Sequence, residues 1–134
     1  MLRKVFVYGT LKRGMSNERY VPNDAIEKMC EATIQGELYY INSGAYPCLK
    51  LEGSNTIYGE LYTIKEKYFD FILKQMDLLE GCPDLYERKI VNVNTENGIE
   101  QCWAYIFNLD AFLGDKIPSG RFIGRQNKQN IYRF

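Results

Sequence analysis

Only one segment of this chain has a strong helical pattern, which limits the folds it can adopt. Between residues 65 and 79 apolar side chains recur at intervals of three and four, as in an amphipathic helix, namely at Phe69, Ile72, Leu73, Met76 and Leu79. Most other ordered segments are short runs of alternating apolar and polar residues. Several strands with one strong helix favour an α+β domain on a curved sheet over a regular βαβ repeat.

Short strands are predicted along most of the chain, over residues 5–7, 32–41, 47–51, 57–64, 86–94 and 100–107. Asn97-Gly98 favours a tight turn that would make the last two strands an antiparallel hairpin, and residues 42–44 would join the second and third strands. A second, shorter helix is predicted over residues 22–30, capped by Asn23 or Asp24. Closing the sheet into a small barrel would remove its exposed edges.

Length and composition indicate a single domain over residues 1–134. The chain has 134 residues, of which 46% are apolar, enough to bury one core. Residues 116–134 carry five basic and no acidic side chains, and Pro118, Gly120 and Gly124 interrupt any regular pattern there. We therefore expect an irregular basic tail at the C-terminus.

The charge balance argues against nucleic acid or a membrane as partner. Seventeen basic and seventeen acidic residues cancel, and no stretch is long or apolar enough for a signal or membrane-spanning segment. We expect a cytoplasmic protein with a small-molecule partner. Because no long apolar surface stripe remains once the core helix is assigned, we also expect a monomer.

Histidine is absent, and this excludes much catalytic chemistry. Ser-His and Cys-His nucleophilic pairs and histidine metal sites cannot form. The four cysteines stand far apart with no CxxC pair, which disfavours a zinc site or a redox dithiol. A base that works near neutral pH should therefore be an Asp or a Glu.

The opening strand ends in a glycine-bounded polar loop, Tyr8-Gly9-Thr10-Leu11-Lys12-Arg13-Gly14. Without a Cβ at Gly9 the chain can turn sharply there and bring its amides close to an anionic group. A nucleotide phosphate loop would need a Lys after the second glycine, where this chain has Met15. The loop taken alone is thus either an anion site or an ordinary turn.

Glu80 is the carboxylate that stands out. It follows Met76 by four residues and Leu73 by seven, so a continuing helix would place it on the apolar stripe, near the helix C-terminus. Burial and the helix dipole would both raise its pKa, as a general acid/base requires. Alternatively, the helix ends by Leu79 and Glu80 turns into solvent, satisfied by Arg88 or a backbone amide. Asp77 is a second candidate, farther from the centre of the stripe.

Three stretches of the chain match one known family in the same order. They are residues 5–14 with Asn17, Tyr-Gly-Glu-Leu-Tyr at 58–62, and Leu-Glu-Gly-Cys-Pro-Asp-Leu-Tyr-Glu-Arg at 79–88. On these motifs the chain resembles the γ-glutamylcyclotransferase-like family over residues 4–107, most closely its γ-glutamylamine cyclotransferases. The tail after Phe107 does not match, so it stays open whether Arg121 or Arg125 shapes a leaving-group pocket.

This resemblance implies a fold, a reaction and a site. The fold would be a small mixed β-barrel with flanking helices. The reaction would cyclise the γ-glutamyl group of a γ-glutamyl amide, of the γ-glutamylamine or γ-glutamyl-ε-lysine type, to 5-oxoproline and release a free amine, without cofactor or metal. Tyr8, Gly9, Thr10 and Leu11 would hold the glutamyl group, and Glu80 would be the catalytic acid/base.

Two other classes of function stay open on the sequence. A non-catalytic small-molecule binding protein would keep the loop and the pocket but turn nothing over. It would gain little from a desolvated carboxylate, which favours the enzyme. A structural or protein-interaction domain would leave the loop and Glu80 without a joint explanation.

Overall fold

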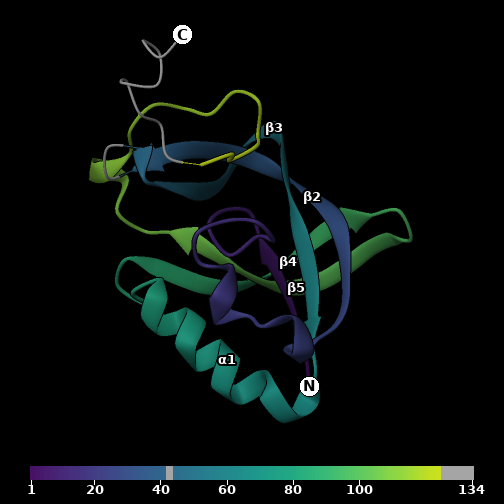
Figure 1. The fold of residues 1–134 in the computed structure, drawn as a ribbon. Coiled ribbons are helices and arrows are strands. Elements are labelled where there is room, and N and C mark those ends of the chain that lie inside the picture. The colour runs from purple at the N-terminus through teal and green to yellow at the C-terminus, as the bar shows by residue number, and fades with distance from the viewer. Residues whose placement is uncertain (42–43, 125–134) are drawn as a thin grey trace, which may run out of the picture.

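The structure is a computed structural model that describes residues 1–41 and 44–124 (Figure 1). Its strands are β1 (Lys4–Val7), β2 (Ile26–Ile41), β3 (Tyr46–Ile64), β4 (Tyr86–Thr95) and β5 (Gly98–Phe107). One α-helix, α1 (Glu66–Leu79), and three short 3₁₀ turns, η1 (Glu18–Tyr20), η2 (Asn23–Ala25) and η4 (Asp110–Phe112), complete the described part of the chain.

The five strands close into a barrel in the order β1-β3-β2-β4-β5. All neighbours pair antiparallel except β1 and β5, which run parallel and meet at Val5 and Trp103. In Figure 1, α1 lies along one side of the barrel and the tip of the β4–β5 hairpin extends past β2 and β3. The predicted α+β class with a small mixed barrel is confirmed, with one flanking α-helix in the described residues.

Two hydrophobic clusters lie on the two faces of β1, because successive strand residues point to opposite sides. Val5 and Val7 pack with the buried face of α1, whose Phe69, Ile72 and Met76 occupy the predicted apolar stripe. Phe6 belongs to the second cluster, with side chains from β2, β3, β4 and β5. The helix prediction over residues 65–79 is confirmed to within one residue.

Replacing Met76 by alanine should destabilise the protein through the cluster under α1. Met76 is fully buried, so its truncation removes apolar contacts and leaves a cavity, at a cost of about 2–5 kcal/mol in the free energy of unfolding. Urea denaturation measures this. Leu78→Ala on the same helix is the control, since Leu78 is 71% exposed and its loss should change stability by less than about 0.5 kcal/mol. Equal effects would contradict the assigned helix face.

The predicted helix over residues 22–30 is wrong. Only Asn23–Ala25 forms a helical turn, and from Ile26 the chain is already in β2, with Cys30 opposite Leu61 of β3. Local apolar spacing suggested a helix, but pairing along the whole of β3 satisfies the backbone of this segment instead.

The strands predicted over residues 47–51 and 57–64 are two parts of the single strand β3. Its register against β2 shifts between Gly36, which faces Asn55, and Glu37, which faces Lys50, so that residues 51–54 have no partner on β2. A Cβ on Gly36 would lie 2.4 Å from the carbonyl oxygen of Lys50, which explains the glycine at this bulge. Of the connection predicted at residues 42–44, residues 42 and 43 lie outside the described residues.

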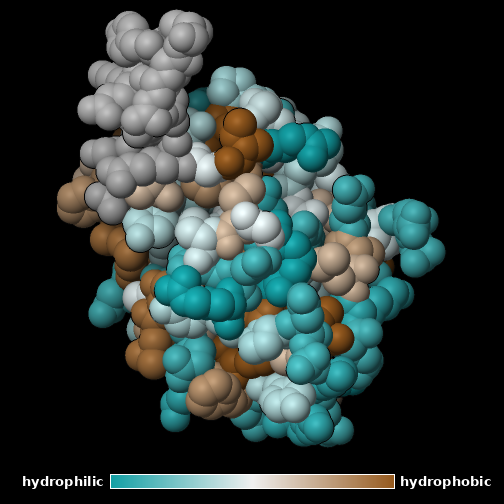
Figure 2. Space-filling view, in the orientation of Figure 1, coloured by the Kyte–Doolittle hydropathy of each residue, from teal (hydrophilic) through white to brown (hydrophobic). Residues whose placement is uncertain are grey.

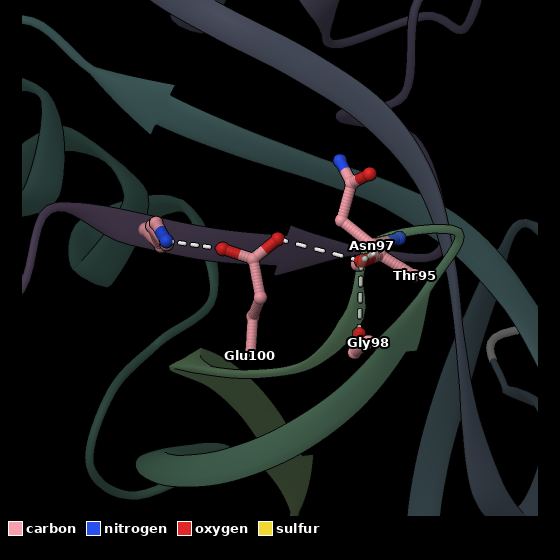
Figure 3. A network of polar contacts seen from close by, with 5 residues as sticks. Thr95, Asn97, Gly98 and Glu100 are labelled. Carbon is pink, nitrogen blue, oxygen red and sulfur yellow. Dashed lines mark hydrogen bonds and ion pairs between the residues drawn. The ribbon is translucent and has the colours of Figure 1, made fainter.

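The hairpin predicted at Asn97-Gly98 is confirmed, with β4 and β5 paired from Thr95 and Gly98 onward. The Thr95 hydroxyl donates to the Gly98 carbonyl at 2.9 Å and accepts from the Asn97 amide at 3.2 Å (Figure 3). Glu100, in the same network, pairs with Lys4 of β1, and the hydrogen bond from Lys4 lowers the pKa of Glu100. This network ties the hairpin to β1.

The described part of the basic tail, residues 116–124, packs on the barrel. Lys116 forms a single β-bridge with Tyr39, and the carbonyl of Gly120 accepts a hydrogen bond from the Tyr58 amide at 2.9 Å. Lys12 Nζ donates to the Phe122 carbonyl at 2.7 Å, which links the tail to the opening loop. The rest of the predicted tail, residues 125–134, lies outside the described residues.

On the face shown in Figure 2, hydrophilic side chains separate several small hydrophobic patches from one another. Within the described residues, no helix is both long and apolar enough to cross a membrane.

Candidate active site

A cavity of about 200 Å³ opens where β1 runs into its loop. The C-terminal end of α1, the beginnings of β3 and β4 and part of β5 form its other walls. It is lined by Phe6, Val7, Tyr8, Gly9, Thr10, Leu11, Asn17, Ile41, Tyr46, Pro47, Leu79, Glu80, Leu85, Tyr86 and Tyr105. All five residues predicted for the site therefore line one cavity, although Glu80 is separated from the loop by about seventy positions.

Asn17 and Tyr8 hold the loop in place. The Asn17 amide donates to the Thr10 carbonyl at 2.8 Å, and its side chain donates to the Thr10 hydroxyl at 2.9 Å. The Tyr8 hydroxyl, which is buried, donates to the Tyr105 carbonyl at 2.7 Å. Gly9, Thr10 and Leu11 lie after the end of β1. Within residues 1–41 and 44–124, their backbone amides donate no hydrogen bond to another backbone group. Such amides beside a cavity can bind an oxygen atom that carries negative charge.

Gly9 is required because another residue lies very close to it. Its φ is not among the positive values of the structure, so a left-handed turn is not the reason for the glycine. A Cβ at this position would lie 2.6 Å from Cγ and 3.0 Å from Cδ of Pro47. The missing side chain thus lets Pro47 close one wall of the cavity against the loop.

Glu80 caps the C-terminus of α1 and is partly buried in the cavity wall. Its backbone amide donates to the Met76 carbonyl at 2.9 Å, which continues the helical hydrogen-bonding pattern. Burial raises the pKa of the Glu80 carboxyl from 4.5 to about 7. Among the described residues, its side chain forms no hydrogen bond or ion pair that would hold it in the charged form. A carboxyl with this pKa can take up and release protons at neutral pH.

Arg88, the partner considered for a solvent-facing Glu80, binds the other candidate carboxylate. Its Nε and Nη2 donate to the two oxygens of Asp77 at 2.9 and 3.2 Å. The Tyr105 hydroxyl donates to Asp77 as well, at 2.7 Å. Asp77 is therefore engaged in a structural network, and Glu80 is the carboxyl that faces the cavity.

Two further tyrosines of the cavity, Tyr86 and Tyr105, have hydroxyl partners that the sequence did not indicate. The Tyr86 hydroxyl donates to the Pro47 carbonyl at 2.8 Å, and Tyr105, which also lines the cavity, donates from its hydroxyl to Asp77. Burial raises the pKa of both phenols, with a smaller contribution from Glu80 at Tyr86 and from Asp77 at Tyr105, so they stay neutral. In a chain with eleven tyrosines, aromatic residues at strand positions look like ordinary core residues.

A larger cavity, of about 600 Å³, lies elsewhere on the barrel and contains neither Glu80 nor Tyr8. Mostly polar and charged residues of β2, β3, the end of β4 and the β4–β5 turn line it, together with Lys12 and Arg121. The Arg121 guanidinium stacks on the Tyr58 ring, 3.7 Å from its centre. Arg121 therefore lies outside the wall of the smaller cavity, and Arg125 falls outside the described residues.

All four cysteines are free thiols, and burial raises the pKa of both Cys48 and Cys102 to about 12. In the described part of the chain, no three His, Cys, Asp or Glu side chains come together as a metal site would require.

The closed barrel thus brings a carboxyl of raised pKa and a loop whose backbone amides are unpaired among the described residues to the wall of one small cavity. The family model described as "Gamma-glutamyl cyclotransferase, AIG2-like" matches residues 5–123. The chain belongs to this family.

Several proteins of known name or structure are similar to the chain. The gamma-L-glutamyl-butirosin B gamma-glutamyl cyclotransferase of Niallia circulans is 34% identical, over 95% of this chain and 81% of that protein. Gamma-glutamylaminecyclotransferase A of Danio rerio is 32% identical, over 88% of this chain and 76% of that protein. The crystal structure of a mouse AIG2-like protein superposes with a TM-score of 0.68, covers 95% of this chain and 99% of its own, and is 24% identical, which supports the fold.

Proposed function

We propose that this protein converts a γ-glutamyl amide into 5-oxoproline and a free amine, with Glu80 as the catalytic acid/base. The observation that carries the proposal is that a carboxyl with a pKa of about 7 and the Tyr8–Leu11 loop line the same small cavity. Family membership supports the γ-glutamyl part of the substrate. The name of the Danio rerio relative, a gamma-glutamylaminecyclotransferase, supports an amine as the leaving group.

The reaction needs no nucleophile from the protein. The α-amine nitrogen of the substrate attacks its own γ-carbonyl carbon, and a five-membered ring closes as the bond from that carbon to the leaving nitrogen breaks. One proton moves from the attacking nitrogen to the leaving nitrogen, so atoms balance without water. Holding the substrate folded in a small cavity favours such a ring closure strongly.

Glu80 is suited to carry this proton. As a carboxylate it accepts the proton from the attacking amine, and as a carboxylic acid it delivers the proton to the departing amine. A pKa near the working pH makes both steps accessible. Its freedom from hydrogen bonds to other described side chains leaves both oxygens available to the substrate.

The loop amides would stabilise the charge that develops on the γ-carbonyl oxygen. The free amides of Gly9, Thr10 and Leu11 lie on the cavity wall, and the contacts of Asn17 to Thr10 and of Tyr8 to Tyr105 fix the loop beforehand. Preorganised donors of this kind stabilise a transition state more than flexible ones, because they need not reorient.

The proposal is tested by incubating the purified protein with a panel of γ-glutamyl compounds and measuring 5-oxoproline and free amine. The panel contains γ-glutamyl-ε-lysine, other γ-glutamyl amines and γ-glutamyl amino acids. We expect equal amounts of both products from at least one γ-glutamyl amine. A protein that binds a panel member but releases 5-oxoproline from none would instead be a non-catalytic binding protein of the same fold.

Activity should depend on pH through the ionisation of Glu80. The carboxylate form is needed to accept the first proton, so kcat/KM should fall about tenfold per pH unit below a midpoint near 7 and level off above it. The substrate must also lose its α-ammonium proton before it can attack, so kcat/KM is expressed per neutral α-amine, with a pKa of about 8 for that group, and the remaining pH dependence is that of Glu80. Measuring kcat/KM from about pH 5 to about pH 8 tests this. A flat profile would exclude Glu80 as the base.

A further inference from the structure

The C-terminal turn of α1 carries a second carboxylate, which takes no direct part in the proposed reaction and contacts two strands. Asp77 precedes Glu80 by three residues, in the last turn of the helix. It accepts two hydrogen bonds from Arg88 of β4 and one from the Tyr105 hydroxyl of β5, at 2.9, 3.2 and 2.7 Å. These three contacts join the helix end to the barrel.

We propose that Asp77 is a positioning residue, which fixes Glu80 against the opening loop by anchoring the end of α1 to β4 and β5. This inference rests on the proposed function of Glu80. Glu80 is the C-cap residue and, among the described residues, its side chain has no hydrogen-bonding partner of its own. Its location therefore depends on where the last helical turn is held.

The same network reaches the opening loop through Tyr105. Its hydroxyl donates to Asp77, while its backbone carbonyl accepts the hydrogen bond of the Tyr8 hydroxyl at 2.7 Å. One residue of β5 thus connects the helix end that carries Glu80 with the loop that begins at Tyr8. Anchoring the helix end and the loop to one strand keeps Glu80 and the loop amides at a constant separation. Small displacements of groups in an active site lower the reaction rate strongly.

Arg88 is itself fixed, which makes it a suitable anchor. Its guanidinium lies over the Trp103 ring, 4.5 Å from the ring centre, and the Trp103 indole nitrogen donates to the Leu2 carbonyl at 3.1 Å. The side chains of Arg88 and Asp77 are about three-quarters buried, at 23% and 26% exposure. A planar guanidinium that contacts both carboxylate oxygens restricts rotation as well as distance.

The test compares Asp77→Asn and Tyr105→Phe with the unchanged protein on the best γ-glutamyl substrate. We expect Asp77→Asn to lower kcat by about 10- to 100-fold, with KM changed by less than about threefold, at a temperature where the variant is fully folded. The midpoint of its pH profile should stay near 7, because Asp77 acts on position rather than charge. Tyr105→Phe removes one of the three hydrogen bonds and should lower kcat in the same direction by a smaller factor.

Glu100→Gln is the matched control. It breaks the ion pair of Glu100 with Lys4, whose side chains are 21% and 35% exposed, and neither residue lines the smaller cavity. We expect this variant to lower the melting temperature without lowering kcat. It thereby separates the loss of a partly buried ion pair from the loss of positioning.

Three results would overturn the positioning role. One is an unchanged kcat in folded Asp77→Asn. Another is a shift of a pH unit or more in the midpoint of the pH profile of kcat/KM, with an unchanged value at high pH. Such a shift would mean that Asp77 acts through its charge. The third applies if Asp77→Asn does not fold: Tyr105→Phe with full activity then excludes the role. Absence of 5-oxoproline from the unchanged protein would instead contradict the proposed function.

Discussion

Glu80→Gln should lower 5-oxoproline formation by about 10³-fold while leaving substrate binding largely intact. The amide has nearly the same size and polarity but cannot accept the proton of the attacking amine or protonate the leaving amine. The loop amides and the cavity remain, so a residual rate from positioning is expected. Steady-state kinetics with the best panel substrate and a binding measurement with the same compound separate the two effects.

The same substitution should stabilise the folded protein at about pH 8 by roughly 2 kcal/mol. Burial raises the pKa of Glu80 from 4.5 to about 7, so the folded state holds more protons than the unfolded state between these values. The contribution of Glu80 to the free energy of unfolding therefore falls as the pH rises from about 4.5 to about 7, and it stays low above that range. Glutamine does not ionise, so the variant does not lose this free energy of unfolding as the pH rises.

Urea unfolding of both proteins at about pH 4.5 and about pH 8 measures this difference, which should appear only at the higher pH. A variant that is inactive yet more stable cannot owe its inactivity to unfolding. Equal turnover in the two proteins would exclude Glu80 as the acid/base. Equal stability at both pH values would contradict a desolvated carboxyl.

Gly9→Ala should lower kcat/KM by about 10²-fold, because the new methyl group pushes the loop and Pro47 apart. The added Cβ would lie 2.6 Å from Pro47 Cγ, closer than packed carbon atoms approach each other. Either the loop amides or the wall formed by Pro47 must move, and both line the cavity with Glu80. The overpacking should also cost about 1–3 kcal/mol of stability, which thermal denaturation measures.

A second substitution can test the cause directly. Pro47→Ala removes both Cγ and Cδ, the atoms that the new methyl group would strike, and retains the backbone carbonyl that accepts from Tyr86. The double variant with Gly9→Ala should therefore recover part of the activity and stability lost in Gly9→Ala. If it is no better than Gly9→Ala, contact with Pro47 is not the reason for the glycine.

Local sequence patterns predicted the structure correctly where the residues that show the pattern also form the element itself. The apolar spacing of α1 matches its buried face, and Asn97-Gly98 forms the turn between β4 and β5. The predicted helix over residues 22–30 failed for the opposite reason. Its apolar spacing fits a helix as well as a strand, and the partner that decides, β3, lies about thirty positions further on.

The site divides in the same way between local and distant information. The residue types were predictable: without histidine, a base near neutral pH must be a carboxylate, and Glu80 falls on the apolar stripe of the helix. The sequence motifs also indicated the family to which the chain belongs. The roles of Tyr86 and Tyr105 were not predictable, because their hydroxyls find partners on other strands and on α1.

By itself, then, the sequence determined the family, the one strong helix and the candidate proton carrier, since these depend on residue identity and local spacing. Tertiary structure decided what surrounds Glu80. Burial by residues distant in the chain raises the pKa of its carboxyl, and Arg88 of β4 binds Asp77 instead of Glu80. It also decided why Gly9 is a glycine: Pro47 approaches from another strand and leaves no room for a side chain.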